Sequence, residues 1–279
     1  MESTEKYWKK RFEGAGKEFE DDYQISIWSK HGMFRRINTF FRIFRGISVN
    51  KNAIIFDIGC GPGTYTKTIY DMGYKIIGVD YSKPTIMKAI KKSKRRDIYY
   101  IVSDAYSLPF KDAYANVIIC LGLLQSISNE NAIISEIVRT LKKDGIILLM
   151  TLNSLSIRII LKEFLYKFLK YETTSNTEKE TENQYLRRYN PLKLINIFKN
   201  EGFENIEVKG VYVFPEALIT IESFLEKIMF FRIIDKLPIL SLLFAHSFII
   251  IARRDTKNYY NNKNENNCRT WTSCTCSSV

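Results

Sequence analysis

The sequence is poor in histidine and proline, and no stretch of it is apolar enough to cross a membrane. Only two histidines and six prolines occur among its 279 residues. The longest apolar stretch, residues 237–252, is interrupted by Pro238 and His246, and it is shorter than the ~20 residues that a membrane-spanning helix needs. Residues 1–6 also lack the apolar core of a secretory signal. We therefore expect a cytoplasmic protein.

The five cysteines are too few and too unevenly spaced for a disulfide framework. Cys60 and Cys120 lie in apolar, strand-like surroundings that favour buried, reduced thiols. The other three lie near the C-terminus without a nearby histidine, whereas a structural zinc site needs four ligands. We therefore predict no metal site and interpret residues 256–279 as a disordered tail. The alternative is a tail that is itself modified or recognised.

The chain carries a formal net charge of +12, with 46% hydrophobic and 26% charged residues. These fractions are ordinary for a globular protein that buries a core. The positive charge predicts attraction to an anionic partner such as a membrane surface, a nucleic acid or an acidic substrate. It fits a lysine-rich compositional bias equally well, so charge alone identifies no partner.

Residues 1–50 read as a helical N-terminal extension. Apolar residues recur at helical spacing between residues 33 and 44, interleaved with arginines. A basic amphipathic helix of this kind can lie on a membrane, which leaves peripheral membrane contact open. Such a stripe more often packs on its own domain, and we favour packing.

Between residues 53 and 151 short apolar runs alternate with helical patterns. The predicted strands span residues 53–58, 74–79, 98–102, 115–121 and 145–151. Strands separated by helices indicate βαβ units and a parallel sheet. Right-handed crossovers, with the strand order reversing at the first strand, place helices on both faces.

The second half of the chain predicts further helices and two more strands. The expected helices span 153–170, 191–200 and 216–236, a polar loop spans 172–184, and the strands span 205–213 and 248–253. We therefore predict one domain over residues 51–255 with helical cap insertions at 153–190 and 214–240.

A glycine-rich turn follows the first predicted strand. Gly59, Gly61 and Gly63 alternate there, and Thr64 stands where the dinucleotide-binding spacing requires another glycine. Such a turn brings the backbone close to a ligand at a helix N-terminus. Asp57 would repel a pyrophosphate, but it suits a ligand that carries an ammonium and a sulfonium cation.

Two further acids end the next two strands. Asp80 lies 23 residues after Asp57, and an acid at that position can accept hydrogen bonds from both ribose hydroxyls of an adenosine ligand. Tyr81 can cover the adenine, and Asp104 can accept from its amino group. Parallel strands bring these acids to one crevice, although Asp80 can also cap a helix and Asp104 can be a surface turn residue.

Together these segments resemble the class I S-adenosylmethionine-dependent methyltransferases. Residues 57–63 resemble their first motif, residues 79–82 their acidic loop, and residues 104–120 and 136–145 their later motifs. The subgroup that is most similar includes the ubiquinone- and menaquinone-type small-molecule enzymes. The resemblance implies an α/β, doubly wound, seven-stranded, mostly parallel sheet of the Rossmann-like methyltransferase type, whose last strand is antiparallel.

The resemblance also implies S-adenosylmethionine as the cofactor, bound by residues at positions 57–64, 80–82, 104–105 and 121. The predicted cofactor-binding residues are Asp57, Gly59, Cys60, Gly61, Gly63, Thr64, Asp80, Tyr81, Ser82, Asp104, Ala105 and Leu121. Cys60 is expected to contribute only its backbone or packing, and Ser82 is also a suitable helix N-cap.

The catalytic group is not determined by the sequence. An oxygen acceptor usually needs a base, for which His31, Tyr189 and His246 are the candidates, although His246 also fits a buried, hydrogen-bonded side chain. An acceptor carbon that is already activated as an enol needs no strong base. The further candidates for the acceptor pocket are Tyr23, Trp28, Tyr185 and Arg188.

Two absences restrict the acceptor. Residues 121–125 lack the Asp/Asn-Pro-Pro-Tyr/Phe motif of nucleic-acid amino methylation, and no Pro-Cys pair exists for attack on cytosine. We therefore predict an enzyme that methylates an O, N or C atom of a small, lipid-like acceptor. The alternatives are a non-catalytic S-adenosylmethionine-binding module that acts through its basic surface or tail, and a methyltransferase of RNA or peptide. The sequence does not indicate an oligomeric state.

Overall fold

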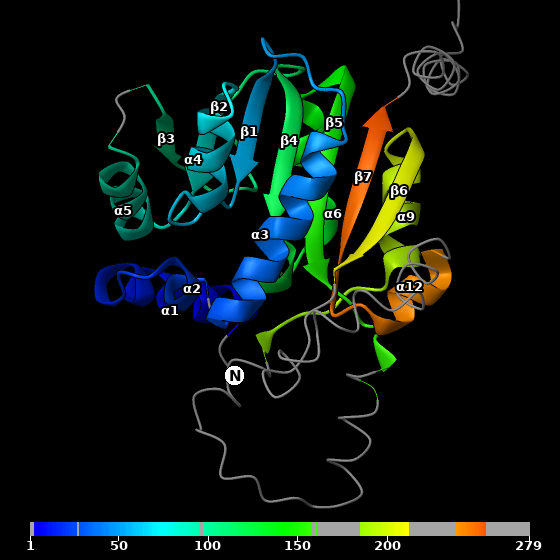
Figure 1. Cartoon of the computed structure of the whole chain (residues 1–279), viewed down its shortest axis with the longest axis horizontal. Helices are drawn as coiled ribbons and strands as arrows, with labels where there is room; N and C mark the ends of the chain where they lie inside the picture. Colours follow the sequence, from blue (N-terminus) through cyan, green and yellow to red (C-terminus); the bar gives the residue numbers. More distant parts are fainter. Residues whose placement is uncertain are drawn as a thin grey trace, which may run out of the picture.

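The computed structural model describes residues 3–26, 28–94, 97–157, 160, 185–211 and 238–254 of the chain. Its centre is one seven-stranded sheet in the order β3-β2-β1-β4-β5-β7-β6, with helices on both sides (Figure 1). The strands are β1 (Ile54–Ile58), β2 (Lys75–Asp80), β3 (Tyr99–Val102), β4 (Ala115–Leu121), β5 (Leu141–Leu152), β6 (Phe203–Val211) and β7 (Ser247–Arg254). The strand order reverses between β1 and β4, which is where such sheets bind ligands.

The pairing of the strands confirms the predicted fold class. Strands β1 to β5 pair in parallel, whereas β7 runs antiparallel to both β5 and β6. Strand β5 begins at Leu141, four residues before its predicted start, because Leu141 already pairs with Ala115 across an irregularity in the register. The sheet is therefore the doubly wound, mostly parallel sheet that the resemblance implied.

The helices are α1 (Thr4–Glu18), α2 (Asp22–Ile25), α3 (Lys30–Arg45), α4 (Thr64–Asp71), α5 (Lys83–Ser93), α6 (Glu130–Thr140), α9 (Pro191–Asn200) and α12 (Pro238–Phe244), with a 3-10 turn, η1, at Leu124–Ser126. Short polar side chains cap the N-termini of α1, α3, α5, α6 and α9. The side chain of Asn190 accepts from Leu192 N, and Pro191 opens α9, where its missing N–H is not needed. Helix α9 has the bounds that the sequence predicts.

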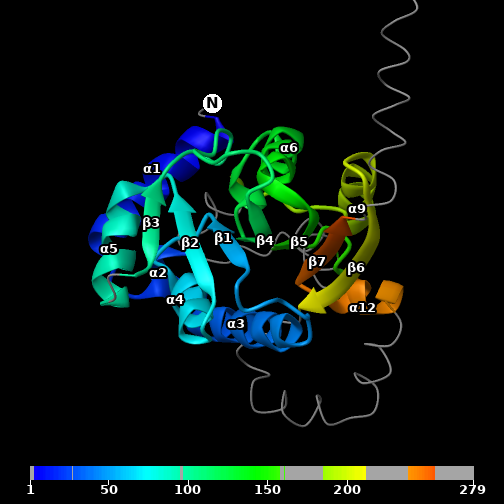
Figure 2. The same ribbon diagram turned by 90° about the horizontal axis from the view of Figure 1, so that it is seen from above.

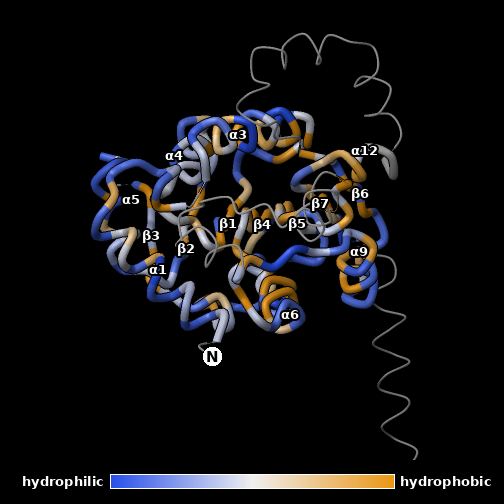
Figure 3. The backbone as a smooth tube through the Cα atoms, turned by 90° about the horizontal axis from the view of Figure 1, so that it is seen from below, coloured by the Kyte–Doolittle hydropathy of each residue, from blue (hydrophilic) through white to orange (hydrophobic). Residues whose placement is uncertain are grey.

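The side chains of β1 alternate between two hydrophobic layers. Ile55 packs with Phe40 and Phe44 of α3 on one face, and Phe56 packs with Ile137 of α6 on the other. Figure 2 shows α3 and α4 on one side of the sheet and α6 and α9 on the opposite side. Figure 3 shows hydrophobic residues concentrated along the central strands, so the core lies in these two layers.

The apolar stripe of α3 packs against the sheet, as we favoured. Phe40, Phe41 and Phe44 are buried there, and only Phe34 points outward with 60% of its surface exposed. None of the helices in the described ranges is both long and apolar enough to span a bilayer.

Several predicted segments lie outside the described residues. These are the polar loop at 172–184, the helix at 216–236, the tail at 256–279, and most of the helix at 153–170 and of the cap insertions. Asn153 forms an isolated bridge with Tyr189, so these two residues lie side by side although 35 positions separate them in the chain.

We expect Phe56→Ala to lower the free energy of unfolding by about 3–5 kcal/mol, because it removes a buried ring from the core. Phe56 is fully buried and its ring centroid lies 4.0 Å from that of Phe110. Phe34→Ala makes the same chemical change at an exposed position and should change the free energy by less than about 0.5 kcal/mol. Urea unfolding measures both; equal effects of the two substitutions would contradict the layer assignment.

Candidate functional site

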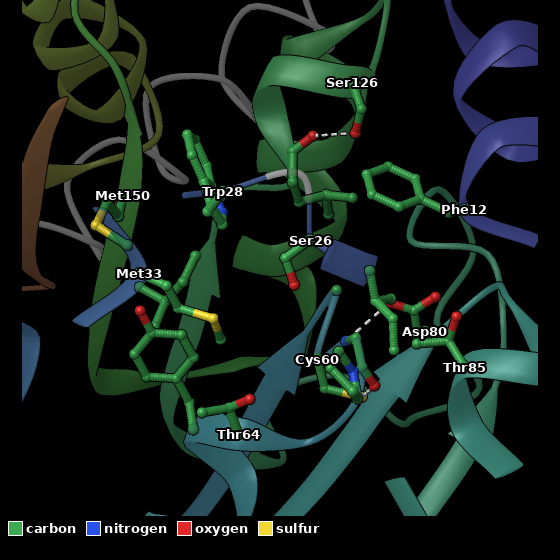
Figure 4. A pocket seen from close by; sticks show the side chains of 18 of the residues that line it. Phe12, Ser26, Trp28, Met33, Cys60, Thr64, Asp80, Thr85, Ser126 and Met150 are labelled. Atoms are coloured by element: carbon green, nitrogen blue, oxygen red, sulfur yellow. Dashed lines mark hydrogen bonds between the residues drawn. The ribbon is translucent and has the colours of Figure 1, made fainter. Parts of the chain in front are cut away.

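Two adjoining cavities lie at the carboxyl ends of β1, β2 and β4. The larger holds about 870 Å³ of empty space and the smaller about 500 Å³, both including space open to solvent. Gly59, Asp80 and Tyr81 line both of them. The two cavities therefore meet at the tips of β1 and β2, and Figure 4 shows the larger one.

The glycine turn has a backbone that other residues adopt only with strain. Gly59, Gly61 and Gly63 all have positive φ, at 75°, 54° and 82°. A Cβ at Gly63 would lie 2.6 Å from the hydroxyl oxygen of Tyr100, whereas one at Gly61 would meet no atom within 4 Å. Gly63 is thus required for packing at the start of α4, while Gly61 faces open space on the cavity side.

The carboxylate of Asp80 anchors this turn. Its Oδ2 accepts from Gly61 N and its Oδ1 accepts from Ser82 N, both at 2.9 Å. Burial raises the pKa of Asp80, and the two backbone N–H groups act against that rise. Each carboxylate oxygen keeps a lone pair that can accept from a ligand hydroxyl in the cavities.

Asp57 lies beneath the turn and lines neither cavity. It is 1% exposed, and its Oδ2 accepts from the hydroxyl of Thr66 in α4 at 2.6 Å. Burial, together with the nearby charge of Asp80, raises the pKa of Asp57 to about 7. In this arrangement Asp57 connects β1 to α4 and does not point toward a ligand.

Helix α1 covers the smaller cavity. Trp8 and Lys9 line it from α1, opposite Asp104 and Ala105 at the end of β3. Lys9 Nζ lies 3.0 Å from Asp104 Oδ2, and the hydroxyl of Tyr81 donates to Trp8 O at 3.0 Å. The predicted adenosine-binding residues therefore also hold the N-terminal extension in place.

A buried arginine in the wall of the larger cavity was not predicted. Arg36 is 3% exposed, and its guanidinium lies 3.5 Å from the ring centroid of Trp28. It donates to Gly32 O and Ser247 Oγ and lies 3.1 Å from His246 Nδ1. No carboxylate among the described residues pairs with it.

Burial lowers the pKa of Arg36 to about 10, so it remains charged at neutral pH. The sequence could have indicated that Arg36 is buried, because residue 36 falls within the helical spacing of Met33, Phe40 and Phe44. An arginine on the buried side of a helix needs an anionic or hydrogen-bonding partner.

The structure brings nine of the twelve predicted cofactor residues to the cavities. The larger cavity has Gly59, Cys60, Gly61, Thr64, Asp80, Tyr81 and Leu121, and the smaller adds Asp104 and Ala105. The other three lie behind them: Gly63 and Ser82 are the N-caps of α4 and α5, and Asp57 lies under the turn.

None of the three candidate bases lines either cavity. The hydroxyl of Tyr189 donates to Leu124 O at 2.9 Å, His246 lies beside Arg36, and His31 is on α3 without lining either space. Trp28 lines the larger cavity. Tyr23, Tyr185 and Arg188 line neither.

Comparison with known proteins places this geometry among methyl-transferring enzymes. Residues 56–149 match a family model described as a methyltransferase domain. The chain is 25% identical over 195 residues to a ubiquinone biosynthesis O-methyltransferase of Rickettsia typhi, covering 66% of this chain and 77% of that one.

Two solved structures share the fold. A SAM-dependent methyltransferase from Archaeoglobus fulgidus has a TM-score of 0.54 and 16% identity, with 83% of this chain and 97% of that chain covered. A magnesium protoporphyrin IX methyltransferase from Synechocystis with bound SAM has a TM-score of 0.56 and 14% identity, with 91% and 99% covered.

We expect Asp57 to make the stability of the protein depend on pH between about 4 and 7. Its pKa of about 7 in the folded state exceeds the value of about 3.9 in an unfolded chain. The folded state thus binds the proton more tightly, so this contribution is lost as pH rises through that window. The free energy of unfolding of Asp57→Asn, relative to that of the unmodified protein, should therefore be higher at about pH 7.5 than at about pH 5.

Urea unfolding at the two pH values measures this gain, and Asp144→Asn on the surface is the matched control. A stability difference between Asp57→Asn and the unmodified protein that is the same at both pH values would contradict the assignment.

Proposed function

Because this chain belongs to the class I S-adenosylmethionine-dependent methyltransferases, we propose that it methylates an O, N or C atom of a small, lipid-like acceptor held in its larger cavity. S-adenosylmethionine is the methyl donor of the family. The observation that carries the proposal is the place of Asp80, whose carboxylate lies where the two cavities meet at the tips of β1 and β2.

The proposed cofactor site spans both cavities. Asp104 and Ala105 would hold the adenine in the smaller cavity, and Asp80 would accept from the ribose hydroxyls. The amino-acid end would lie over the glycine turn in the larger cavity. There Arg36, buried and without a carboxylate partner among the described residues, would pair with the carboxylate of the cofactor.

Catalysis by this site would rest on positioning and on exclusion of water. The bound cofactor supplies a methyl group on a positively charged sulfur, and that charge disappears as the methyl group is transferred. Trp28, Met33 and Met150 line the larger cavity and would keep water from the reacting atoms. An acceptor held in line with the methyl group gains the rate advantage of an intramolecular reaction.

The lining of the cavity and the named relatives support an apolar, planar acceptor. The relative from Rickettsia typhi is named as an enzyme of ubiquinone biosynthesis, and the aromatic and thioether side chains of the cavity suit a similar ring. An acceptor of this kind can be delivered at a membrane surface. The outward face of α3, where Phe34, Arg42 and Arg45 are exposed, is suited to peripheral contact with an anionic bilayer.

We propose that the predicted parts of the chain have different roles. Residues 1–50 would act as a lid, since α1 lines both cavities and α3 lines the larger one. Residues 51–255 would form the catalytic domain with cap insertions at 153–190 and 214–240, followed by the tail at 256–279.

The proposed role of Arg36 can be separated from that of Asp80 with two ligands. S-adenosylhomocysteine carries the amino-acid carboxylate, whereas 5′-methylthioadenosine lacks it. Arg36→Met should weaken binding of S-adenosylhomocysteine about 100-fold, because it removes one partner of a buried charge pair. The affinity for 5′-methylthioadenosine should stay within about twofold of that of the unmodified protein. Asp80→Asn should weaken both, since both carry the ribose.

Calorimetric titration gives the affinity of each variant and of the unmodified protein for both ligands. Arg42→Met, an exposed change on the same helix, is the matched control. Equal weakening of both ligands by Arg36→Met would rule out the carboxylate contact. Failure of the unmodified protein to bind either ligand would rule out the cofactor site.

Methyl transfer itself is tested with donor that carries a radiolabelled methyl group and with fractions of a cell extract. We expect label in a small product that partitions into organic solvent. Label in the RNA or protein fraction would instead support the alternative acceptors. Cofactor binding without transfer to any fraction would identify a non-catalytic binding module.

A further inference from the structure

Gln125 is a buried polar side chain whose amide has no hydrogen-bond partner among the described residues. It lies in η1, directly after β4, is 6% exposed and lines the larger cavity. Among the described residues, Gln125 forms hydrogen bonds through its backbone and none through its side chain. Its carbonyl oxygen accepts from Arg187 N at 3.0 Å. The amide keeps contact with the cavity space, so an acceptor oxygen in the cavity can replace the water that would otherwise hydrogen-bond it.

The space next to this amide is bounded by a glycine and an indole. Gly122 has a φ of +94°, and a Cβ built on it would lie 3.8 Å from Gln125 Nε2 and 4.0 Å from Trp28 Cζ2. The absence of a side chain at Gly122 thus leaves room between the amide and the indole. Arg36 lies against the Trp28 ring at 3.5 Å and holds the indole in this orientation.

This corner of the cavity lies across from the glycine turn, and Arg36, the proposed partner of the cofactor carboxylate, borders it. Figure 4 shows Trp28 and Ser126, the neighbour of Gln125, on one side of the larger cavity, and Cys60 and Asp80 on the other. The cation that borders Trp28 is Arg36, whereas Arg187, whose N–H donates to Gln125 O, is paired with Glu130. With the cofactor carboxylate paired to Arg36, the corner offers an acceptor oxygen the neutral amide of Gln125, which carries both a donor and an acceptor.

We propose that Gln125, Gly122 and Trp28 form the acceptor subsite and that Gln125 selects acceptors with a neutral oxygen. The planar part of the acceptor lies beside Trp28 and over Gly122, and a hydroxyl or carbonyl oxygen pairs with the Gln125 amide. Gln125 positions the acceptor and takes no proton, because an amide does not titrate near neutral pH. This inference rests on the proposed methyltransferase function.

Two aromatic probes of matched shape test the inference. 2-Naphthol and 2-methylnaphthalene differ only in a hydroxyl against a methyl group, and equilibrium dialysis against the protein saturated with S-adenosylhomocysteine gives both dissociation constants. We expect Gln125→Met to weaken 2-naphthol about three- to tenfold, the value of one neutral hydrogen bond. The affinity for 2-methylnaphthalene should stay the same or rise.

Gln24→Met makes the same change in α2, at a residue that lines neither cavity, and should leave the ratio of the two dissociation constants unchanged. Trp28→Phe provides a second variant and should weaken both probes. Binding of S-adenosylhomocysteine within about twofold of the unmodified protein shows that each variant is folded.

An unchanged ratio in Gln125→Met would overturn the inference, as would a complex that binds neither probe. Either result with intact S-adenosylhomocysteine binding overturns the acceptor subsite alone. Loss of S-adenosylhomocysteine binding by the unmodified protein would instead overturn the proposed function on which the subsite rests.

Discussion

The carboxylate of Asp80 is the interaction on which the site depends. Its two oxygens accept from Gly61 N, in the turn after β1, and from Ser82 N, at the start of α5. The bond to Gly61 N joins the tips of two neighbouring parallel strands where the two cavities meet, and the bond to Ser82 N fixes the carboxylate in place. Because a buried carboxylate is unfavourable unless it is hydrogen-bonded, the turn and the acid stabilise each other. The left-handed glycines permit this geometry, since the backbone must bend sharply to present Gly61 N to the acid.

The N-terminal helices complete the site from outside the sheet. Helix α1 closes the smaller cavity through contacts of Trp8 and Lys9 with Tyr81 and Asp104. Helix α3 packs its aromatic side chains on the sheet and places one charged residue, Arg36, on that buried side. The stripe that made α3 resemble a membrane-surface helix is therefore the stripe that fixes the wall of the larger cavity.

Much of the fold was predictable because its signals are local. Short apolar runs, a proline at the first position of α9 and the alternating glycines each act within a few residues, and the structure has those elements at nearly the predicted bounds. The roles of individual residues in the site were less predictable from the sequence. Gly63 and Ser82 cap helices, and Asp57 binds Thr66 below the turn. The N-cap role of Ser82 was among the predicted alternatives, but spacing did not indicate that the Asp57 carboxylate turns toward α4.

The sequence by itself determined the order of strands and helices and the turn that a ligand approaches, since both follow from short-range periodicity and from the backbone freedom of glycine. Only the tertiary structure decided which residues form the walls. Arg36 meets Ser247 across 211 positions of the chain, and Lys9 meets Asp104 across 95. Contacts between such distant segments arise from the packing of whole helices on the sheet, and no local pattern encodes that packing.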